Sequence, residues 1–494
     1  MKLNPATAID GYKVDHRRQY PDKTEVVFSN LTARTTRRDY TQRVVFFGLQ
    51  YFIKSFLIKS WEEDFFKQPK EDVLRRFSRR INNYLGPNNV GTQHIADLHD
   101  LGYLPIKIMA LPEGSVYPLR VPCLVIQNTD ERFFWLTNYL ETILSTSVWG
   151  MCTSATTAHE YKKILTAHAI ETDGAIDFVN WQGHDFSFRG MFGAEAAAMS
   201  GAAHLLSFTG TDTIPAIDFL EDYYGANSDL ELVGGSVAAT EHSVMCAGGM
   251  ENELETFRRL IQDISPAGIV SIVSDSWDFW QVMTYLTVKL KEQILARDGK
   301  VVFRPDTGCP VKMICGDADA EPGSPEHKGA IECLWEVFGG SITSKGYKLL
   351  DPHVGLIYGD SITIERAQAI CAGLKAKGFA STNVVFGIGS YTYQYVTRDT
   401  DGYAVKATFA RIAGEDREIF KAPKTGDGTK NSAKGLVAVY KDAQGEFYLK
   451  DQASWKEVND CEFVTVFENG RLSNEVTLSE VRVRLAKQLN QHIL

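Results

Sequence analysis

Four polar side chains recur at nearly even intervals through the middle of the chain, and their types suit the handling of a charged small molecule. They are Asp212, His242, Asp275 and Asp306, separated by 30, 33 and 31 residues. Carboxylates can supply oxygen ligands to a cation, whereas a lone histidine is usually structural, a metal ligand or a hydrogen-bonded core group. Intervals of this size match one strand–helix–strand unit. We therefore expect the four residues to follow successive parallel strands.

Two glycine-containing segments further along the chain have the composition of a phosphate site. The apolar run 354–358 ends in Gly359-Asp360-Ser361, and the run 383–386 ends in Gly387-Ile388-Gly389-Ser390. Backbone N–H groups in such loops can approach an anion, and the last two strands of (β/α) barrels commonly bind phosphate. The alternative is a pair of ordinary turns that need glycine for a positive φ.

A helix is predicted between these two segments. Ala367, Ile370, Cys371 and Leu374 fall at helical spacing and form one apolar face. Asp360 or Ser361 is expected to cap the start of this helix, and Gly378 is expected to end it.

The order of strand, polar cluster and helix repeats from about residue 175 to residue 390. A doubly wound sheet could produce this order, but polar residues after nearly every strand favour a barrel, whose strand ends face one pocket. We predict an α/β barrel over 151–390. The ends of the chain, 1–150 and 391–494, are predicted to pack together as an additional α+β sheet domain, because neither has the pattern of a complete core.

Composition limits the classes of partner. The formal net charge of −10 argues against a general nucleic-acid or anionic-membrane binder, although it allows a local basic pocket. The eight cysteines contain no CxxC pair, which favours reduced thiols. The sequence shows neither a signal peptide nor an apolar run of membrane-spanning length. We expect a soluble cytoplasmic protein.

With these residues in view, the chain resembles the nicotinamide phosphoribosyltransferases of the type II phosphoribosyltransferase family, nearly from end to end. Each motif is weak alone, but their number and order make the resemblance specific. The motifs are Asp10-Gly-Tyr-Lys-Val14, Phe47-Gly-Leu-Gln-Tyr51, Trp135-Leu-Thr-Asn138, Glu141-Thr-Ile-Leu144, His184-Asp-Phe-Ser-Phe-Arg189, Gly210-Thr-Asp-Thr213, Glu241-His-Ser243, Ser274-Asp-Ser276, Arg304-Pro-Asp306, Ser344-Lys-Gly-Tyr-Lys-Leu-Leu350 and Gly359-Asp360.

The resemblance implies a fold and a reaction. The fold would be an irregular α/β barrel with an additional sheet domain. The enzyme would join nicotinamide to 5-phosphoribosyl-1-pyrophosphate with Mg²⁺, giving nicotinamide mononucleotide and pyrophosphate in NAD salvage. It would be a homodimer with shared active sites, and ATP would phosphorylate His242, with Asp275 as its partner.

The resemblance also implies where the nicotinamide binds. Phe186 and Tyr12 would stack on the pyridine ring, with Tyr12 reaching in from the partner subunit. Asp212 would accept from the amide N–H and repel the carboxylate of nicotinate. Asp10 would assist it, and Arg304 would lie beside the ring. A structural alternative for Asp212 is capping of the helix that begins at Pro215.

The remaining implied residues surround the ribose and the phosphates. Asp306 and Asp360 would hold ribose hydroxyls or Mg²⁺, and which residues ligate the metal stays open. Ser271 would line the pocket. Phosphate contacts would come from Arg34, Arg189, Arg398, Lys406 and the backbone of Gly359, Gly387 and Gly389. The chain departs from the family at Ser390, where the family has glycine, and serine adopts a positive φ less readily.

Three other readings stay open. The first is a nicotinate phosphoribosyltransferase. The second is a sugar-phosphate aldolase or isomerase on a barrel, which needs a Schiff-base Lys or a Glu/His pair at a strand end, and the predicted barrel strand ends carry no Lys. The third is a non-enzymatic binding protein, for which the polar strand ends would be dispensable.

Overall fold

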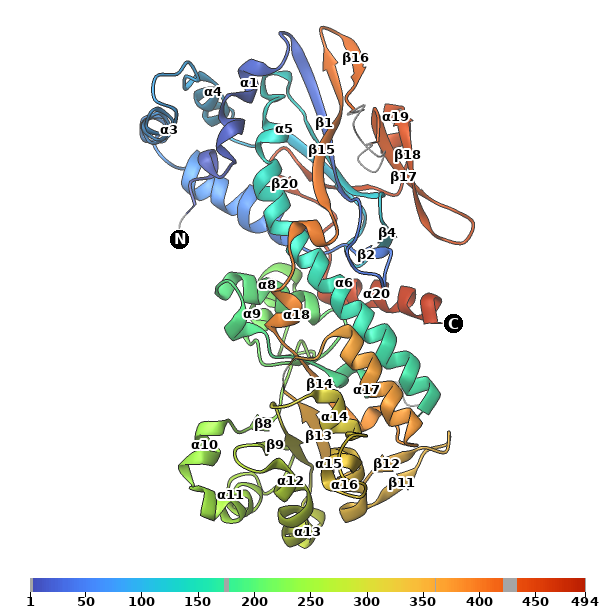
Figure 1. Ribbon diagram of the computed structural model, residues 1–494. Helices are drawn as coiled ribbons and strands as arrows, with labels where there is room; N and C mark the ends of the chain where they lie inside the picture. Colours follow the sequence, from blue (N-terminus) through green and yellow to red (C-terminus); the bar gives the residue numbers. More distant parts are fainter. Residues whose placement is uncertain (1–2, 173–176, 360, 421–432, 494) are drawn as a thin grey trace. The chain divides into compact units, whose positions relative to one another are not determined.

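The computed structural model describes residues 3–172, 177–359, 361–420 and 433–493 (Figure 1). The chain divides into two compact units, each described here by itself. The central unit comprises Thr157–Glu221, Asn227–Tyr395 and Leu489–Leu494, and the terminal unit comprises Met1–Thr156, Asp222–Ala226 and Val396–Gln488.

The central unit is built on a parallel sheet of seven strands in the order β7-β6-β14-β13-β10-β9-β8. An isolated parallel bridge between Gly210 and Gly235 links β7 to the segment before β8, so the sheet curls back toward its own edge. This confirms a mixed α/β fold with a curled parallel sheet. The strands are β6 (Gly183–Asp185), β7 (Gly210–Thr211), β8 (Ala238–Ala239), β9 (Val270–Val273), β10 (Val301–Arg304), β13 (Val354–Tyr358) and β14 (Val384–Ile388).

Helices alternate with these strands. They are α7 (Val179–Gln182), α8 (Ala194–His204), α9 (Pro215–Tyr224), α10 (His242–Ala247), α11 (Glu253–Arg259), α12 (Phe279–Gln281), α13 (Thr287–Leu295), α14 (Pro310–Cys315), α15 (Pro325–Lys328), α16 (Ala330–Phe338), α17 (Ile364–Ala376) and α18 (Ser390–Tyr393). A small antiparallel pair, β11 (Gly340–Ile342) and β12 (Lys348–Leu350), lies beside α16. Among the described helices of the whole chain, none combines the length and apolar character that a membrane span requires.

Helix α17 tests the sequence prediction at residue level. The predicted apolar face is buried, and Gly378 follows the helix with a φ of 76°, as expected for a residue that ends it. The predicted cap at Asp360 or Ser361 was wrong. Thr363 caps the helix, because its side chain accepts a hydrogen bond from the Arg366 N–H.

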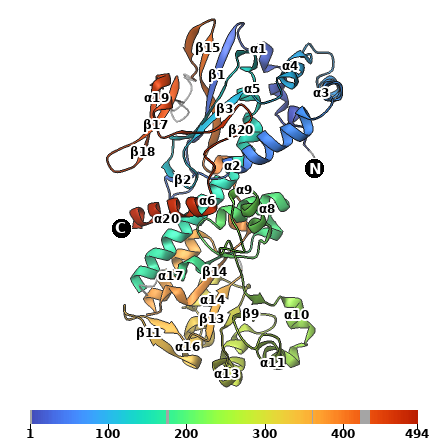
Figure 2. The same cartoon turned by 180° about the vertical axis from the view of Figure 1, so that it is seen from behind.

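The terminal unit contains an antiparallel seven-stranded sheet in the order β16-β15-β1-β5-β3-β19-β20. The N-terminal strands β1, β5 and β3 form the middle of the sheet, and C-terminal strands flank them on both sides. Strands β1 and β15 lie side by side in both views (Figure 1 and Figure 2). The strands are β1 (Thr24–Ala33), β3 (Ile106–Ala110), β5 (Pro122–Asn128), β15 (Tyr403–Ile412), β16 (Glu415–Glu418), β19 (Val464–Glu468) and β20 (Arg471–Leu472).

The rest of the terminal unit packs around this sheet. Its buried core joins side chains from both chain ends, such as Phe28, Trp61, Val405 and Phe467. The Asn469-Gly470 pair, which in the sequence is a strong signal for a tight turn, connects β19 to β20, and both residues have positive φ. The remaining elements are β2 (Arg43–Val45), β4 (Val116–Pro118), β17 (Leu436–Lys441), β18 (Phe447–Ala453), α1 (His16–Gln19), α2 (Leu49–Phe52), α3 (Lys70–Leu85), α4 (Gln93–Leu101), α5 (Leu136–Tyr139) and α19 (Trp455–Asn459). Two helices, α6 (Glu141–Thr172) and α20 (Leu478–Ile493), begin in the terminal unit and end in the central unit.

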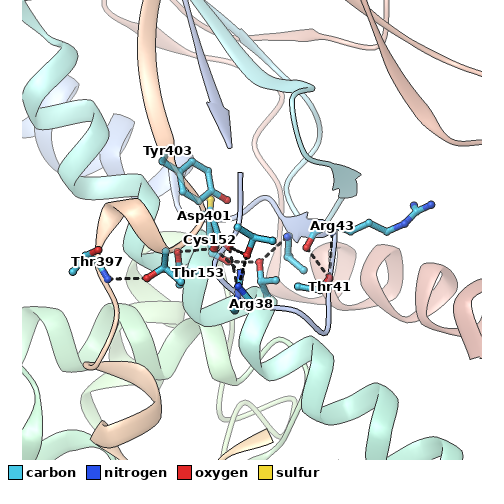
Figure 3. Close-up of polar contacts among 12 residues, drawn as sticks. Arg38, Thr41, Arg43, Cys152, Thr153, Thr397, Asp401 and Tyr403 are labelled. Atoms are coloured by element: carbon cyan, nitrogen blue, oxygen red, sulfur yellow. Dashed lines mark hydrogen bonds and ion pairs between the residues drawn. The ribbon is translucent and has the colours of Figure 1, made fainter. Parts of the chain in front are cut away.

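A buried ion pair connects distant segments of the terminal unit. Figure 3 shows the Asp401 carboxylate facing Arg38 and Thr153. Arg38 donates to Asp401 through Nη2 at 2.5 Å and Nε at 3.2 Å, and the Thr36 hydroxyl donates at 2.9 Å. The Asp401 side chain is fully buried and that of Arg38 is 8% exposed. These bonds hold the segment after β1 against the turn that carries Arg398.

We expect Asp401→Asn to destabilise the protein by about 3–5 kcal/mol, because it leaves the buried Arg38 guanidinium without an opposite charge. The urea midpoint of unfolding measures this loss. Asp399→Asn is the matched control on the same turn, since its contact with Arg398 is solvent-exposed and contributes little. Equal midpoints for the two variants would contradict the role given to the buried pair.

Candidate functional site

A cavity of about 840 Å³ lies at the carboxyl ends of the strands in the central sheet. Every residue of its lining lies at the end of a strand or in the loop that follows one, because parallel strands present all their carboxyl ends at one edge. The lining consists of Phe186, Phe188, Arg189, Asp212, Arg304, Asp306, Gly359, Gly389 and Ser390. Except for Phe188, these are all residues that the sequence singled out.

Phe186 and Arg304 face each other across part of this cavity. The Arg304 guanidinium lies 5.9 Å from the centre of the Phe186 ring, and its Nη2 donates to the Thr240 carbonyl at 2.7 Å. Its Nε is buried and has no hydrogen-bond partner among the described residues. A flat aromatic ligand stacked on Phe186 would meet both a cation and an unused donor.

Asp212 presents an ionised carboxylate to the cavity. Its Oδ1 accepts hydrogen bonds from His184 Nε2 at 2.8 Å and from the Ser236 hydroxyl at 2.9 Å. Partial burial alone would raise the pKa of Asp212, but these hydrogen bonds and the charge of Arg304 hold the pKa below its usual value. A carboxylate in this state accepts hydrogen bonds and donates none.

His242, Asp275 and Asp306 form a cluster beside the cavity. His242 Nε2 lies 3.3 Å from Asp275 Oδ1 and 3.8 Å from Asp306 Oδ1. Asp275 is nearly buried, and its Oδ2 accepts from the backbone N–H of Asp306 and from Thr307. One ligand atom from each of the three residues lies within 4.8 Å of the others. The side chains of this cluster could either hold a divalent cation or orient the His242 imidazole to accept a phosphoryl group.

The glycine-containing loops contribute Gly359, Gly389 and Ser390 to the cavity. Gly389 has a φ of −97°, and neither Gly389 nor Ser390 has a positive φ, so serine at position 390 causes no backbone strain. A Cβ atom on Gly190 would lie 2.0 Å from the Ser390 hydroxyl oxygen. The Ser390 side chain therefore occupies space that the glycine at 190 leaves open. Asp360 lies outside the described residues.

Two other predicted residues lie near the site without lining this cavity. Gly387 lies within β14, and a Cβ there would lie 2.7 Å from a Phe186 ring carbon and from the Tyr358 carbonyl oxygen. Ser271 is buried in β9 and lines a second cavity of about 760 Å³, which also includes Phe186, Asp212 and Arg304 in its lining. The predicted role of Gly387 in phosphate binding stays a prediction.

The other predicted residues belong to the terminal unit. Asp10 accepts a hydrogen bond from the Thr142 hydroxyl at 2.8 Å, and the Tyr12 side chain is exposed. Arg34, Arg398 and Lys406 form a basic group. Burial lowers the pKa of Lys406, Glu141 opposes this change, and the charges of Arg34 and Arg398 lower the pKa further.

Sequence reasoning missed the contacts that orient Asp212. His184 appeared only as part of a motif, and Ser236 was not among the predicted site residues. The spacing of His184 and Phe186 carried a usable signal, because residues two apart on an extended segment project toward the same face. The contact with Asp212 depends on the pairing of β6 with β7, which local spacing does not reveal.

Comparisons with known proteins agree with this geometry. Residues 181–464 match the model of the nicotinate phosphoribosyltransferase (NAPRTase) family, and residues 4–108 match the nicotinamide phosphoribosyltransferase N-terminal domain. A protein of Acinetobacter baylyi named nicotinamide phosphoribosyltransferase is 56% identical over 99% of this chain and 98% of its own length. A protein of Mycoplasma pneumoniae with the same name is 35% identical over 89% of this chain and 97% of its own length.

Two solved structures share the fold. Nicotinate-nucleotide pyrophosphorylase from Pyrococcus furiosus has a TM-score of 0.59 at 14% identity, covering 100% of this chain and 97% of its own. Human nicotinic acid phosphoribosyltransferase has a TM-score of 0.55 at 15% identity, covering 98% and 94%. At these identities the similarity shows the fold of the chain, and the substrate has to be inferred from the residues of the site.

We expect Gly387→Ala to destabilise the protein by about 1–3 kcal/mol, because the added methyl group meets Phe186 on one side and a backbone carbonyl on the other. Gly355→Ala in the neighbouring strand β13 is the matched control. Its methyl group would meet the flexible Lys300 side chain first, at 3.3 Å, so little change is expected. Unfolding midpoints in urea compare the two variants, and an equal loss for both would refute the close packing against Phe186.

Proposed function

Because the chain belongs to the nicotinate phosphoribosyltransferase family, we propose that it is a nicotinamide phosphoribosyltransferase. Members of this family are enzymes, and the chain is a pentosyltransferase. The proposed reaction joins nicotinamide to 5-phosphoribosyl-1-pyrophosphate, giving nicotinamide mononucleotide and pyrophosphate in NAD salvage. The ionised Asp212 carboxylate in the cavity wall carries the choice of base.

In the proposed complex, one group of cavity residues contacts the pyridine ring of nicotinamide and another contacts its carboxamide. The pyridine ring stacks on Phe186, beside the guanidinium of Arg304. Its carboxamide donates an N–H to Asp212, which acts only as an acceptor. A nicotinate carboxylate at the same place would meet a like charge, and this repulsion disfavours it.

The ribose and its phosphates occupy the opposite end of the cavity in this proposal. The ring nitrogen of nicotinamide attacks C1 of the ribose while the bond from C1 to the pyrophosphate oxygen breaks. Positive charge develops on the sugar, and the nearby Asp306 carboxylate favours it electrostatically. The 5′-phosphate accepts from the backbone N–H of Gly389, from the Ser390 hydroxyl and from Arg189. The backbone N–H of Gly359, which was also predicted to bind phosphate, already donates to the Pro305 carbonyl at 3.0 Å.

We propose that Mg²⁺ accompanies the pyrophosphate. The donor set suits this ion, because Asp275 and Asp306 supply carboxylate oxygens within 4.8 Å of one another. When bound, the ion neutralises charge on the departing pyrophosphate. The chain's own contribution is to hold Asp275 in place through three hydrogen bonds from Asp306 and Thr307.

We also propose that the enzyme is a homodimer. Tyr12 is 63% exposed within the chain, and in a dimer it would supply the second stacking ring to the partner's site, with Asp10 beside it. Arg34, Arg398 and Lys406 would add positive charge for the phosphates. A molar mass of one chain in light scattering would exclude this arrangement.

The proposal also includes the fold family and the cellular location. The curled sheet corresponds to the irregular barrel of type II phosphoribosyltransferases, with the sheet of both chain ends as an additional domain. An experimental structure tests this correspondence. The eight free cysteines support a cytoplasmic location, where thiols stay reduced. Recovery of the native protein outside the cytoplasm would contradict it.

The direct test of the proposed function is incubation with nicotinamide, phosphoribosyl pyrophosphate and Mg²⁺, followed by detection of the mononucleotide. We expect Asp212→Asn to lower the ratio of kcat/KM for nicotinamide to that for nicotinate by about tenfold or more, because the repelling charge is lost. Asp218→Asn, an exposed change on α9, should leave this ratio unchanged. Unchanged selectivity in Asp212→Asn would refute the assigned role, and a preference for nicotinate in the unmodified enzyme would favour a nicotinate phosphoribosyltransferase.

ATP is proposed to phosphorylate His242, with Asp275 fixing the imidazole tautomer. We expect radiolabel from the γ-phosphate of ATP to appear on the protein as acid-labile, base-stable phosphate, and to be absent in His242→Ala. His353→Ala is the matched control, since His353 also pairs with an aspartate, Asp351, at 2.7 Å but lies before β13 at the opposite edge of the sheet. Label retained in His242→Ala would overturn the proposal.

A further inference from the structure

We infer that His184 is a positioning residue that sets the preference for an amide over a carboxylate by fixing one oxygen of Asp212. The inference rests on the proposed function and goes beyond it by assigning a residue outside the predicted site. His184 Nε2 donates to Asp212 Oδ1 at 2.8 Å, and the Ser236 hydroxyl donates to the same oxygen at 2.9 Å. Among the described residues, no side chain donates a hydrogen bond to Asp212 Oδ2.

Because both donors bind Oδ1, the two oxygens of the Asp212 carboxylate have different roles. Oδ1 is anchored to the protein, so rotation of the carboxylate about its bond to Cβ is restricted. Oδ2 is then the oxygen available to a ligand in either of the two cavities that Asp212 lines. A carboxylate held in this way keeps its charge and its direction, and both are needed to accept from an amide and to repel a nicotinate oxygen.

The imidazole ring of His184 is itself held by its surroundings. His184 lies on β6 opposite Gly210 of β7 and Gly387 of β14, and it is 7% exposed. A Cβ atom on Gly210 would lie 2.7 Å from His184 Nδ1, so the ring packs directly on the glycine. The ring centre also lies 4.6 Å from the centre of the Phe186 ring, at an interplanar angle of 41°.

His184 therefore joins the two parts of the proposed nicotinamide site. Its Nε2 donates to the carboxylate that accepts from the amide, and its ring packs at a tilt against the Phe186 ring on which the pyridine stacks. An error in the position of His184 would move Asp212 relative to Phe186. The geometry assigns His184 a role in selectivity that it exerts through Asp212 without contacting the reacting atoms.

Two substitutions separate this role from simple packing. In His184→Gln the side-chain amide nitrogen reaches the place of Nε2 and can still donate to Asp212. In His184→Asn the amide nitrogen ends near the place of Nδ1 and cannot reach Asp212 Oδ1. Both variants replace the ring with a smaller neutral amide, so the loss of packing is similar in kind and the reach of the donor is what differs.

The experiment measures kcat/KM for nicotinamide and for nicotinate in the unmodified enzyme and both variants, together with the melting temperature and the KM for phosphoribosyl pyrophosphate. We expect His184→Asn to lower the nicotinamide-to-nicotinate ratio about tenfold or more, the size of a lost hydrogen bond to a charged group. His184→Gln should keep most of the ratio. The KM for phosphoribosyl pyrophosphate should change little in either variant, because its phosphates bind at the other end of the cavity.

The outcomes separate failure of the inference from failure of the proposed function. If the unmodified enzyme forms no mononucleotide from nicotinamide, the proposed function fails. If it is active and selective, a folded His184→Asn variant with the same ratio as the unmodified enzyme overturns the inference. Equal loss of ratio in the Gln and Asn variants also overturns it, because packing alone would then explain the effect.

Discussion

The parallel direction of every strand in the central sheet is the constraint on which the candidate site depends. Parallel strands place all their carboxyl ends at one edge, so residues from Phe186 to Ser390 line one cavity although they are far apart in the chain. Five of the seven strands contribute to this lining, each with one to three residues at its end or just after it. The chemistry is thus distributed over loops, while the buried strands keep its parts at fixed distances.

The charged groups of the molecule are held by the same physical means. Asp275 accepts from the backbone and side chain after the next strand, Asp212 accepts from His184 and Ser236, and Asp401 accepts from Arg38 and two threonines. In each case hydrogen bonds offset the cost of removing a carboxylate from water. The difference lies in exposure. Asp401 is fully enclosed and serves the fold, whereas Asp212 stays partly exposed and can meet a ligand.

Patterns within single segments predicted local structure well. The apolar face of α17, the glycine after it and the Asn469-Gly470 turn appear as expected, because each depends on backbone geometry over a few residues. The cap of α17 was misplaced because Asp360, Ser361 and Thr363 are all suitable cap residues within one turn of chain. The expectation that serine at position 390 fits the backbone less readily than glycine also came from residue type alone. A missing glycine suggests strain, but the backbone at 390 has an ordinary negative φ, and Gly190 leaves room for the side chain.

The sequence by itself determined the mixed α/β class, the positions of the strands at 354–358 and 383–386, and the residue types of the polar groups that follow the parallel strands. These follow from periodicity, glycine placement and residue type, which act over short distances along the chain. Only the tertiary structure decided which polar groups touch. Three such contacts depend on strand pairing and on close packing between segments many residues apart. They are the hydrogen bond from His184 to Asp212, the packing of Phe186 against Gly387, and the ion pair of Arg38 with Asp401. Local patterns carry no information about such distances, because the same side chain fits equally well beside many partners until the chain has folded.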